Sequence, residues 1–498
     1  MDLSGAYSAM GSDLFSSLSL VLIAATGLLM VVWDSFRNND RMVPWLGVAA
    51  CTVAIVFELI RMNSPAQSVF YNLMWTGGFA SFINIVVLVS AALTMVLSVP
   101  YLDRIQHNYG EVYALIMFAS VGMILLGTAN NLISIFVGLE TMSICLYILT
   151  GLMRSDEGGT ESALKYFLLG AFSTGFFLYG MVLLYAATGT MYLDQMGVAF
   201  DGSENNLLFW AGVALLLIGF LFKVSAVPFH MWTPDVYQGA PTTLTGFMST
   251  ASKAAAFAAL ILVLFHALPS ERWNMVLATI AALTMILGNV VAIAQTNVKR
   301  MLAYSSIAHA GYILVGLAAG TVAGYSGALF YLLVYSLMNI GAFGVIAMLE
   351  WDGRVGLEQD LDSLAGVGYR RPLLGVTMGF FLFSLTGFPP LGGFIGKYAV
   401  FAPAVDAGLT WLVLIGVLAS AVSAYYYLRV LYVFWMKSED DGNRHAMEFI
   451  AGSPVTVGTA VVLVACAGLL LVLGLYPGVL ETTAGFFDAA SSSLASAR

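Results

Sequence analysis

Four of the chain's six lysines fall inside apolar stretches that are long enough to cross a lipid bilayer: Lys165, Lys223, Lys253 and Lys397. A charged side chain at the centre of a membrane helix costs about 2.5–3.5 kcal/mol on insertion scales, so such residues are rare and mark functional sites. The pKa of a lysine falls readily on burial and rises again beside a carboxylate. A buried lysine with a movable acidic neighbour can capture and release a proton, and these residues therefore predict proton transfer.

Glu140 is the acidic residue nearest the middle of such a stretch, in GLETMSICLYIL. It is either the structural counter-ion of a lysine or a proton site, and the two roles are compatible. Lys223 and Lys253 cannot easily reach water along their helices, so we expect both to act in proton transfer. Lys165 lies only a few residues inside its stretch, and both a relay role and snorkelling to the interface stay open. Arg429 lies toward the end of its stretch, which favours an anchoring role.

A histidine lies in another polar segment of an apolar stretch. Ser305 and His309, in YSSIAHAGY, are four residues apart and share one face of a helix. A buried histidine is either hydrogen-bonded in the core or part of a proton relay, and both roles stay open for His309. His230 follows Lys223 by seven residues, but Pro228 lies between them, so a shared helix face cannot be assumed.

Two further polar features have structural explanations. Asp235, beside Pro234, is expected to be a cap or turn residue. The aromatic run Tyr425, Tyr426 and Tyr427 could donate to a chain of waters, but such runs in membrane helices more often pack or form an interfacial belt.

Composition excludes several other function classes. Hydrophobic residues make up 60% of the 498 residues and charged residues only 9%, whereas an ordinary globular chain is about a quarter charged. The net charge of −9 argues against a nucleic-acid partner, which would need a basic patch. Cys51, Cys145 and Cys466 have no metal-ligand or disulfide spacing. No Walker loop, GxGxxG or His/carboxylate cluster occurs, so we expect this chain to bind neither a cofactor nor a metal.

Apolar runs of roughly 20 residues, the length that crosses a hydrocarbon core about 30 Å thick, recur along the whole chain. They predict about fourteen transmembrane helices, at 14–33, 43–60, 79–100, 111–128, 130–152, 163–188, 207–230, 241–267, 273–294, 300–320, 324–349, 373–403, 410–435 and 455–475. The alternating segments of about ten residues that are typical of a membrane barrel do not appear. The predicted fold class is an all-α polytopic membrane protein.

Positive charges predict the orientation, because cytoplasmic loops carry an excess of Lys and Arg. Eleven such residues lie in odd-numbered loops: Arg37, Arg41, Arg104, Arg154, Lys299, Arg300, Arg354, Arg370, Arg371, Lys437 and Arg444. Three lie on the other side: Arg61, Arg272 and Arg498. We therefore expect the odd-numbered loops in the cytoplasm and both termini outside. No Lys or Arg occurs among the first 13 residues, so we expect no cleavable signal.

Two of the predicted helices contain clusters of helix-breaking residues. The seventh reads FKVSAVPFHMWTPDVYQGAPT and the twelfth reads SLTGFPPLGGFIGKY. Non-helical backbone at membrane depth is tolerated only where it is buried in protein or lines a wet cavity. The breaks lie five helices apart, as do Lys223 and Lys397, and an odd offset reverses the direction through the bilayer. This pattern predicts two inverted five-helix repeats, helices 4–8 and helices 9–13, each with a broken helix.

The predicted organisation is a single membrane domain over residues 1–498. Its parts are 1–105 (helices 1–3), 110–268 (first repeat), 272–436 (second repeat) and 453–498 (helix 14 and a short tail). The repeat also pairs helix 5, which carries Glu140, with helix 10, which carries His309. That correspondence strengthens the case for His309 as a relay.

Several segments together resemble the antiporter-like subunits of respiratory complex I: FKVSAVPFHMWTPDVYQGAPT, SKAAAFAAL, QTNVKRMLAYSSIAHAGY, LMNIGAFGV and SLTGFPPLGGFIGKY. Within that family, ALKYFLLGAFSTG is similar to subunit N of NADH–quinone oxidoreductase, the equivalent of mitochondrial subunit 2. The resemblance extends over roughly residues 110–435 and is most specific in the seventh and eighth helices.

The resemblance implies a fourteen-helix proton channel that carries no redox centre and responds to quinone reduction elsewhere in a larger complex. By motif, Glu140 resembles the helix 5 glutamate of the family and Lys223 its helix 7 lysine partner. Lys253 resembles the central helix 8 lysine, and Lys397 the helix 12 residue on the exit side. Lysine at 397 is more similar to subunits N and L than to subunit M. Lys165 resembles the helix 6 lysine of the family, and His309 resembles a helix 10 relay residue; both of these matches are weaker than the other four.

The resemblance also implies partners and a location. The expected partners are the other membrane-arm and peripheral-arm subunits of complex I, including antiporter-like and small membrane subunits, with NADH, FMN, iron–sulfur clusters and quinone bound by those partners. The expected location is the inner membrane of a bacterium. A multisubunit cation/proton antiporter without redox partners has similar core subunits and is the alternative. A third interpretation is that the chain is a scaffold subunit that has lost its transport role.

Overall fold

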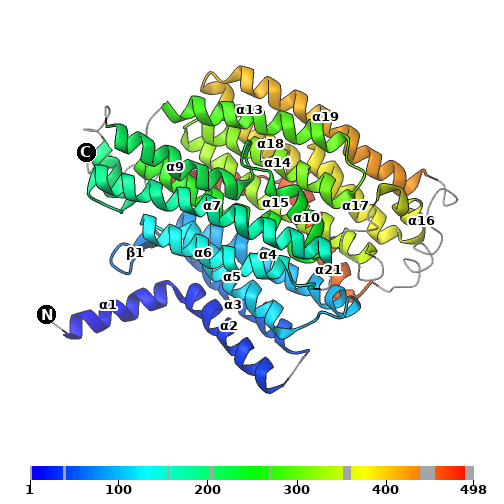
Figure 1. Cartoon of the computed structure of the whole chain (residues 1–498), viewed down its shortest axis with the longest axis horizontal. Helices are drawn as coiled ribbons and strands as arrows, with labels where there is room; N and C mark the ends of the chain where they lie inside the picture. The colour runs from blue at the N-terminus through cyan, green and yellow to red at the C-terminus, as the bar shows by residue number, and fades with distance from the viewer. Residues whose placement is uncertain are drawn as a thin grey trace.

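The computed structural model describes most of the chain as a bundle of helices, many of which run alongside one another (Figure 1). The described residues are 3–37, 41–154, 156–200, 206–268, 272–350, 360–437 and 455–487. Arg354, Arg444 and Arg498, which contribute to the predicted orientation, lie outside these ranges.

The helices follow the order of the predicted spans. Those before the first predicted repeat are α1 (Leu3–Ser16), α2 (Leu18–Phe36), α3 (Val43–Arg61) and α4 (Gly78–Arg104). The next group is α5 (Gly110–Thr128), α6 (Leu132–Thr150), α7 (Glu157–Thr188), α8 (Leu193–Phe200), α9 (Leu207–Val224), α10 (Trp232–Gly239), α11 (Thr242–Phe247), the π-helical turn η1 (Met248–Ser252), α12 (Lys253–Leu262) and the π-helical turn η2 (Val263–Ala267). The last group is α13 (Arg272–Ile293), α14 (Val298–Ala318), α15 (Val322–Leu349), the 3₁₀ turn η3 (Leu361–Leu364), α16 (Val367–Arg370), α17 (Pro372–Thr386), α18 (Gly392–Asp406), α19 (Thr410–Trp435) and α21 (Val457–Leu475).

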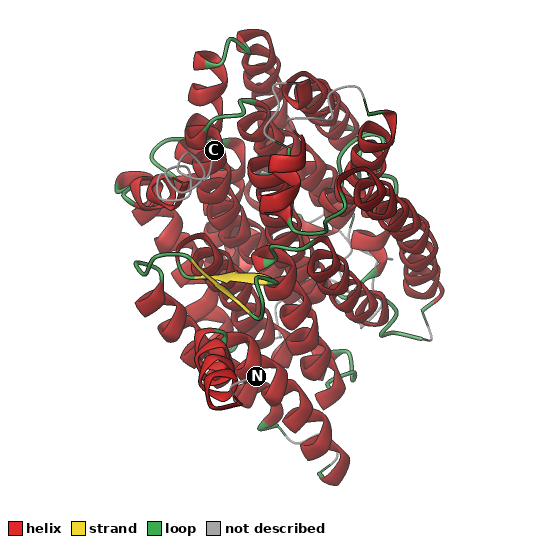
Figure 2. Cartoon of the chain, turned by 90° about the vertical axis from the view of Figure 1, so that its left-hand side faces the viewer, coloured by secondary structure: helices red, strands yellow, loops and turns green. Residues whose placement is uncertain are grey.

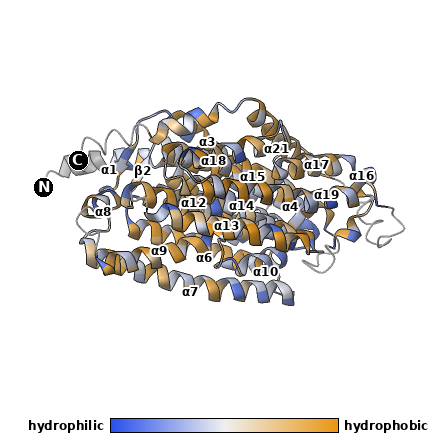
Figure 3. Ribbon diagram, turned by 90° about the horizontal axis from the view of Figure 1, so that it is seen from above, coloured by the Kyte–Doolittle hydropathy of each residue, from blue (hydrophilic) through white to orange (hydrophobic). Residues whose placement is uncertain are grey.

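Helix length and hydropathy agree with the predicted membrane spans. In the described ranges, 13 helical stretches are long and apolar enough to cross a membrane, and each overlaps a predicted span. The remaining predicted span, 373–403, is divided between α17 and α18, which have 15 residues each. Figure 3 shows apolar residues along almost every helix. The predicted all-α polytopic fold class is confirmed.

Both predicted helix breaks are confirmed. Helix α9 ends at Val224, and Ser225 then adopts a left-handed φ of 65°; the chain becomes helical again at Trp232. Helix α17 ends at Thr386, where Gly387 has a φ of 88° that only glycine adopts without strain. In each predicted five-helix series the broken helix is the fourth. The division of the chain into repeat modules itself stays a prediction.

The amino-terminal region differs from the prediction in two details. The first predicted helix, 14–33, begins only at Leu18, because α1 ends at Ser16 and leads away from the bundle (Figure 1). Ser17 lies at this junction, and its hydroxyl donates to the carbonyl of Asp13 at 2.8 Å, a local bond that competes with regular helix. A short antiparallel hairpin, β1 (Gln67–Val69) and β2 (Met74–Thr76), appears in yellow in Figure 2; three-residue strands are too short to leave an alternating pattern.

The centre of the bundle holds the helices that carry the candidate residues. Almost all residues of Thr242–Ala267, the helical stretch that includes Lys253, are buried, as are almost all residues of α14 and α15. In contrast, only about a third of the residues of α2, α7 and α19, or fewer, are buried. Charged groups inside membranes face protein or a water-filled space, and the fold provides such an interior for the side chains of α12 and α14.

Candidate functional site

Lys223 lies at the end of α9, next to the first helix break, and its side chain is buried. Its Nζ donates to Ser143 Oγ of α6 at 2.7 Å. Glu140 lies three residues before Ser143, so both side chains project from the same face of α6. Within the described residues no ion pair joins Glu140 to Lys223, and the α6 hydroxyl that Lys223 contacts belongs to Ser143, one turn after Glu140. The structure therefore brings the predicted pair close together with a serine hydroxyl beside the lysine.

Glu140 has a hydrogen-bond partner of its own. Thr174 of α7 donates through Oγ1 to Glu140 Oε1 at 2.7 Å, and the Glu140 side chain is half-buried. Tyr147 and Tyr166 place their ring centroids 5.4 and 5.6 Å from Lys223 Nζ, distances typical of cation–π contact. The positive charge is thus held between a polar side and an aromatic side.

Lys253 is the first residue of α12, immediately after the π-helical turn η1, and is 1% exposed. Its Nζ donates to the carbonyl oxygen of Ser306 at 2.8 Å and to Ser306 Oγ at 2.5 Å. Tyr335 donates through its hydroxyl to the same Ser306 Oγ at 2.8 Å. Among the described residues, the acceptors of Lys253 are thus the two neutral oxygens of Ser306 on α14, with Tyr335 of α15 bonded to the same hydroxyl and no acidic partner.

His309 is buried and makes hydrogen bonds through both ring nitrogens. Nδ1 lies 2.7 Å from the hydroxyl of Tyr331, and Nε2 lies 3.2 Å from the hydroxyl of Tyr427. Tyr427 is also hydrogen-bonded to Ser305, which shares the His309 face of α14 as predicted. An imidazole with a partner on each nitrogen can accept a proton on one side and release it on the other.

Lys397 reaches across the second helix break. From α18, its Nζ donates to the carbonyl oxygens of Leu385 at 3.1 Å and Thr386 at 2.8 Å, the last two residues of α17. It also donates to Ser420 Oγ of α19 at 2.7 Å. The last carbonyls of a helix have no partner within it and carry partial negative charge, so the break provides a place for the ammonium group.

Tyrosines and His309 fill the space between Lys253 and Lys397. The His309 ring centroid is 5.3 Å from that of Tyr335, which is bonded to the same serine as Lys253. On the other side it is 5.5 Å from the Tyr312 ring, and Lys397 Nζ lies 4.8 Å from the centroid of Tyr312. These groups bring Lys253, His309 and Lys397 into one buried polar region.

The tyrosine run of α19 is only partly packing. Tyr425 is 59% exposed, as expected of an interfacial belt, but Tyr426 and Tyr427 are buried. Tyr426 donates through its hydroxyl to Asn289 Oδ1 at 2.9 Å, and Tyr427 contacts His309. Tyr426 and Tyr427 are thus packed in the interior, as one of the expectations had it, and their hydroxyls are hydrogen-bonded because one face of α19 turns toward the polar region.

Lys165 lies apart from the buried groups. Its side chain is 43% exposed and pairs with Glu161 at 2.6 Å and Asp235 at 2.9 Å. Asp235 also pairs with Arg300 at 2.7 Å, so it bridges α7 and α14 and is more than the cap or turn residue expected from Pro234. His230, half-buried within the first break, is not close enough to Lys223 for a hydrogen bond within the described structure.

Lys299 was counted among the loop charges, and that assignment is wrong. It lies in the first turn of α14, fully buried, with its Nζ 3.6 Å from Glu350 Oε1. Nζ also donates to the carbonyl oxygen of Ala240, between α10 and α11, at 2.7 Å. The sequence signal was Asn297, which caps α14 and places Lys299 inside the helix. The odd-numbered loops then keep ten of their eleven positive charges, so the predicted orientation does not change.

Sequence reasoning also missed Glu58 of α3. Its carboxylate is buried and accepts hydrogen bonds from Ser19 Oγ and from Asn84 Nδ2, the latter at 2.9 Å. It lies near the end of its helix in the sequence, where an acidic residue is normally solvated. Only the packing of α2 and α4 against α3 encloses it.

The described residues contain no group of three or more His, Cys, Asp or Glu side chains that could hold a metal ion. Arg429 donates to the carbonyls of Ile293 and Gln295 at 3.5 and 3.3 Å, at the end of α13, which agrees with an anchoring role. The chemistry available from the buried groups is proton transfer between lysine, histidine, tyrosine and serine side chains.

Comparisons with known proteins agree with this arrangement. The transmembrane family described as NADH:quinone oxidoreductase/Mrp antiporter matches residues 129–423. The NADH-quinone oxidoreductase subunit N of Salinibacter ruber is 63% identical over 498 residues, covering 99% of this chain and 100% of that protein. The subunit N of Trichlorobacter lovleyi is 44% identical over 482 residues, covering 94% and 97%.

Solved structures share the fold. A chain of respiratory complex I from Thermus thermophilus with bound aureothin has a TM-score of 0.79 at 35% identity, covering 93% of this chain and 98% of that chain. A chain of the Mrp complex from Dietzia has a TM-score of 0.83 at 20% identity, covering 95% and 97%; this likeness shows the fold alone. The near full-length matches confirm the resemblance, and the chain belongs to the subunit N family of NADH-quinone oxidoreductase.

Proposed function

We propose that this chain is a proton-translocating subunit in the membrane arm of an NADH–quinone oxidoreductase. The observation that carries the proposal is the placement of three buried lysines beside hydrogen-bonding side chains and helix breaks: Lys223, Lys253 and Lys397. Buried ionisable groups of this kind line proton relays in membrane proteins. The identity to subunit N proteins over nearly the whole chain supports the same assignment.

The proposed cycle begins at Glu140 and Lys223. A conformational or electrostatic signal from the rest of the complex changes their separation, and the Ser143 hydroxyl provides the hydrogen bond that Lys223 keeps when the carboxylate withdraws. Weakening the influence of Glu140 favours release of the proton from Lys223, because a nearby carboxylate stabilises the charged form. Water and side chains then carry the proton toward Lys253.

The second half of the path runs from Lys253 to Lys397. Ser306 and Tyr335 connect Lys253 to the neighbourhood of His309, which has partners on both ring nitrogens. From His309 the proton reaches Lys397 past Tyr312, and is released on the outer side of the membrane. Lys165 has a supporting part only, as a member of the ion-pair network around Asp235.

The proposed setting is the bacterial inner membrane, with both termini on the periplasmic side. The other subunits of the complex bind NADH, FMN, iron–sulfur clusters and quinone, and this chain works without a redox group of its own. Its neighbours in the membrane arm are further antiporter-like and small membrane subunits.

The variant Lys223→Ala tests the proposal in the assembled complex, reconstituted into liposomes with a fluorescent pH probe. We expect NADH-driven proton translocation to be lost while the complex still copurifies with its flavin and iron–sulfur subunits. Arg154→Ala is the control, since Arg154 is an exposed basic residue outside the buried polar region. Normal pumping by a fully assembled Lys223→Ala complex would refute the role of Lys223.

The same preparation separates the alternatives. Copurification with only small, redox-free membrane subunits, together with proton movement driven by a sodium gradient, would identify a cation/proton antiporter. Unchanged pumping after substitution of all three buried lysines would identify a scaffold.

A further inference from the structure

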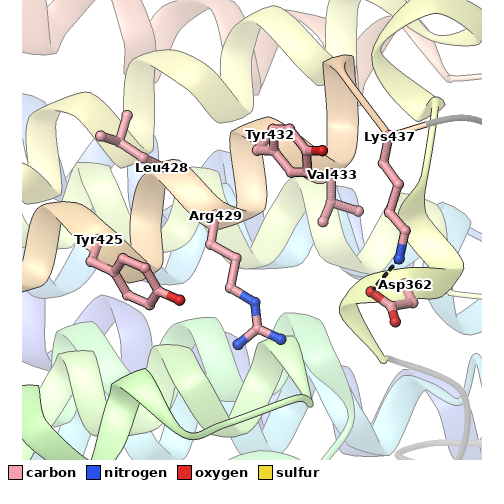
Figure 4. Close-up of a pocket in the computed structure, with 7 residues that line it drawn as sticks. All are labelled: Asp362, Tyr425, Leu428, Arg429, Tyr432, Val433 and Lys437. Atoms are coloured by element: carbon pink, nitrogen blue, oxygen red, sulfur yellow. Dashed lines mark ion pairs between the residues drawn. The ribbon is translucent and has the colours of Figure 1, made fainter.

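A hollow of about 530 Å³ lies at the end of α19, on the outside of the bundle, between α19 and the turn η3. Arg429, Tyr425 and Tyr432 of α19 border it, and Lys437 and Asp362 lie at its far end (Figure 4). Its volume falls within the range of about 300–1,000 Å³ that is usual for small-molecule sites. The proton path proposed above does not use it.

The hollow carries a positive charge that the described residues do not neutralise. Lys437 pairs with Asp362 at 2.9 Å. Arg429 is half-buried and donates to two backbone carbonyls at the end of α13, and no carboxylate of the described chain pairs with it. A guanidinium has five donors in a planar fork that matches phosphate geometry, so the charge and the remaining donors favour an anionic ligand.

The depth of the hollow is that of lipid headgroups. The membrane helix α19 ends at Trp435, whose ring packs edge-on against Tyr369 at 5.4 Å. Tyr369, Tyr425 and Tyr432 are 72%, 59% and 55% exposed, as in an aromatic belt at a membrane interface. The predicted orientation places this end of α19 on the cytoplasmic side, where anionic lipids attract basic residues.

An apolar stripe continues from the hollow along α19 toward the membrane centre. Its side chains Leu428, Leu418 and Leu414 are 48%, 67% and 60% exposed, because α19 packs with its other sides against α13 and α17. Figure 1 shows α19 along an outer edge of the bundle. A soluble phosphate would use only the charged end, whereas a phospholipid would also cover this stripe with an acyl chain.

We propose that the hollow binds the phosphate group of an anionic phospholipid. Arg429 donates to the phosphate oxygens through the guanidinium N–H groups that do not face α13, and the hydroxyls of Tyr425 and Tyr432 are within the same hollow. Lys437 divides its hydrogen bonds between Asp362 and the phosphate. An acyl chain lies along Leu428 and the leucines beyond it.

A photo-crosslinking residue in place of Leu428, such as p-benzoylphenylalanine, tests the proposal in native membranes. Mass spectrometry of the crosslinked chain then identifies the adduct, and we expect phosphatidylglycerol or cardiolipin in excess over their share of the membrane. Adding Arg429→Gln should lower the anionic adduct about fivefold, the factor that corresponds to one basic residue at an anionic membrane surface. Arg429→Lys should retain more of it, and Arg154→Gln, an exposed arginine on the same predicted side, should leave it unchanged.

Three outcomes would overturn the inference. Crosslinks to a neighbouring subunit would identify the hollow as a protein interface. Adducts in proportion to membrane composition, insensitive to Arg429→Gln, would show unselective contact with lipid. Loss of the anionic adduct in the presence of excess inorganic phosphate would show that the site binds free phosphate. None of these outcomes depends on proton pumping, so the proposed function is tested separately.

Discussion

Lys223 is hydrogen-bonded to the hydroxyl of Ser143, which lies one turn after Glu140 on α6. The hydroxyl accepts from Lys223 at 2.7 Å and is bonded in turn to the backbone carbonyl of Leu139. A neutral acceptor stabilises the lysine less than a carboxylate does, so the lysine is held without being locked in its charged form. At the scale of single residues, Ser143 therefore belongs to the proposed switch together with the two charged groups.

Ser143→Ala should slow NADH-driven proton translocation by about tenfold, since a hydrogen bond to a charged group contributes about 1.5–3 kcal/mol and each 1.4 kcal/mol is a factor of ten. Ser143→Thr, which keeps the hydroxyl, should retain most of the rate. Ser134→Ala, at another buried serine of α6, is the control. The measurement is the initial rate of acidification per complex, and equal rates for Ser143→Ala and Ser134→Ala would contradict the prediction.

Glu58 provides a test of stability at the same scale. Glu58→Ala removes the acceptor of the Ser19 and Asn84 bonds and should lower the free energy of unfolding by about 1–3 kcal/mol, because two buried donors lose their partner. Glu58→Gln keeps an acceptor oxygen and should lose a small part of that. Thermal unfolding in mild detergent measures both, and the same loss for Gln as for Ala would show that the charge itself is required.

At the scale of elements, each of the two helix breaks accommodates a buried lysine, but through different backbone groups. The first places Lys223 in the last turn of α9, where the negative end of the helix dipole favours a cation. The second leaves the carbonyls of Leu385 and Thr386 at the end of α17 for Lys397, which comes from the following helix. Each break thus provides backbone carbonyls or a helix end for a lysine at membrane depth.

Close packing maintains the second break. A Cβ added to Gly393 would lie 1.8 Å from the carbonyl oxygen of Ser384, whereas one added to Gly379 of α17 would lie 3.9 Å from its nearest neighbour, Leu431. Gly393→Ala should therefore destabilise the chain by about 1–3 kcal/mol or more, the usual cost of overpacking.

The measurement for Gly393→Ala is the yield and unfolding temperature of the purified complex, with Gly379→Ala as the matched control. Gly379→Ala should change neither by much, because 3.9 Å is an ordinary contact distance. Equal yields and equal unfolding temperatures for the two variants would mean that the close approach of Gly393 to Ser384 is not needed for stability.

At the scale of the whole molecule, Lys299 and Glu350 join parts of the chain that are far apart in sequence. Lys299 lies in the first turn of α14, and Glu350 follows α15. Both contact the segment 240–242, which joins α10 to α11 and includes the first residue of α11: Lys299 through the carbonyl of Ala240 and Glu350 through the hydroxyl of Thr242. That segment leads directly into η1 and Lys253. The pair therefore connects the second helix series to the break of the first.

Lys299→Met should cost about 3–5 kcal/mol of unfolding free energy, because it leaves Glu350 buried without this cation. The double variant Lys299→Met with Glu350→Gln should recover part of the loss, since replacing both members of a buried pair removes the uncompensated charge. A double-mutant cycle measures the coupling. Strictly additive losses would show that the two residues do not act together.

The sequence alone determined the properties that depend on local composition. Hydropathy along the chain predicted the spans, because a bilayer requires about 20 apolar residues of helix whatever surrounds them. Proline and glycine clusters predicted both breaks, because their effect on the backbone is local. The position of Lys223, Lys253 and Lys397 within spans likewise predicted that they are buried. The motifs then indicated the family that the near full-length relatives confirm.

Only the tertiary structure decided which side chains meet. Ser306 beside Lys253, Tyr427 beside His309 and Glu350 beside Lys299 come from different helices, separated by 53, 118 and 51 positions in the chain. The rotation of each helix about its axis decides these contacts, and a shift of one residue turns a side chain by about 100°. Hydropathy cannot specify that rotation in helices that are apolar on every side, so the partners of each lysine follow from packing in three dimensions.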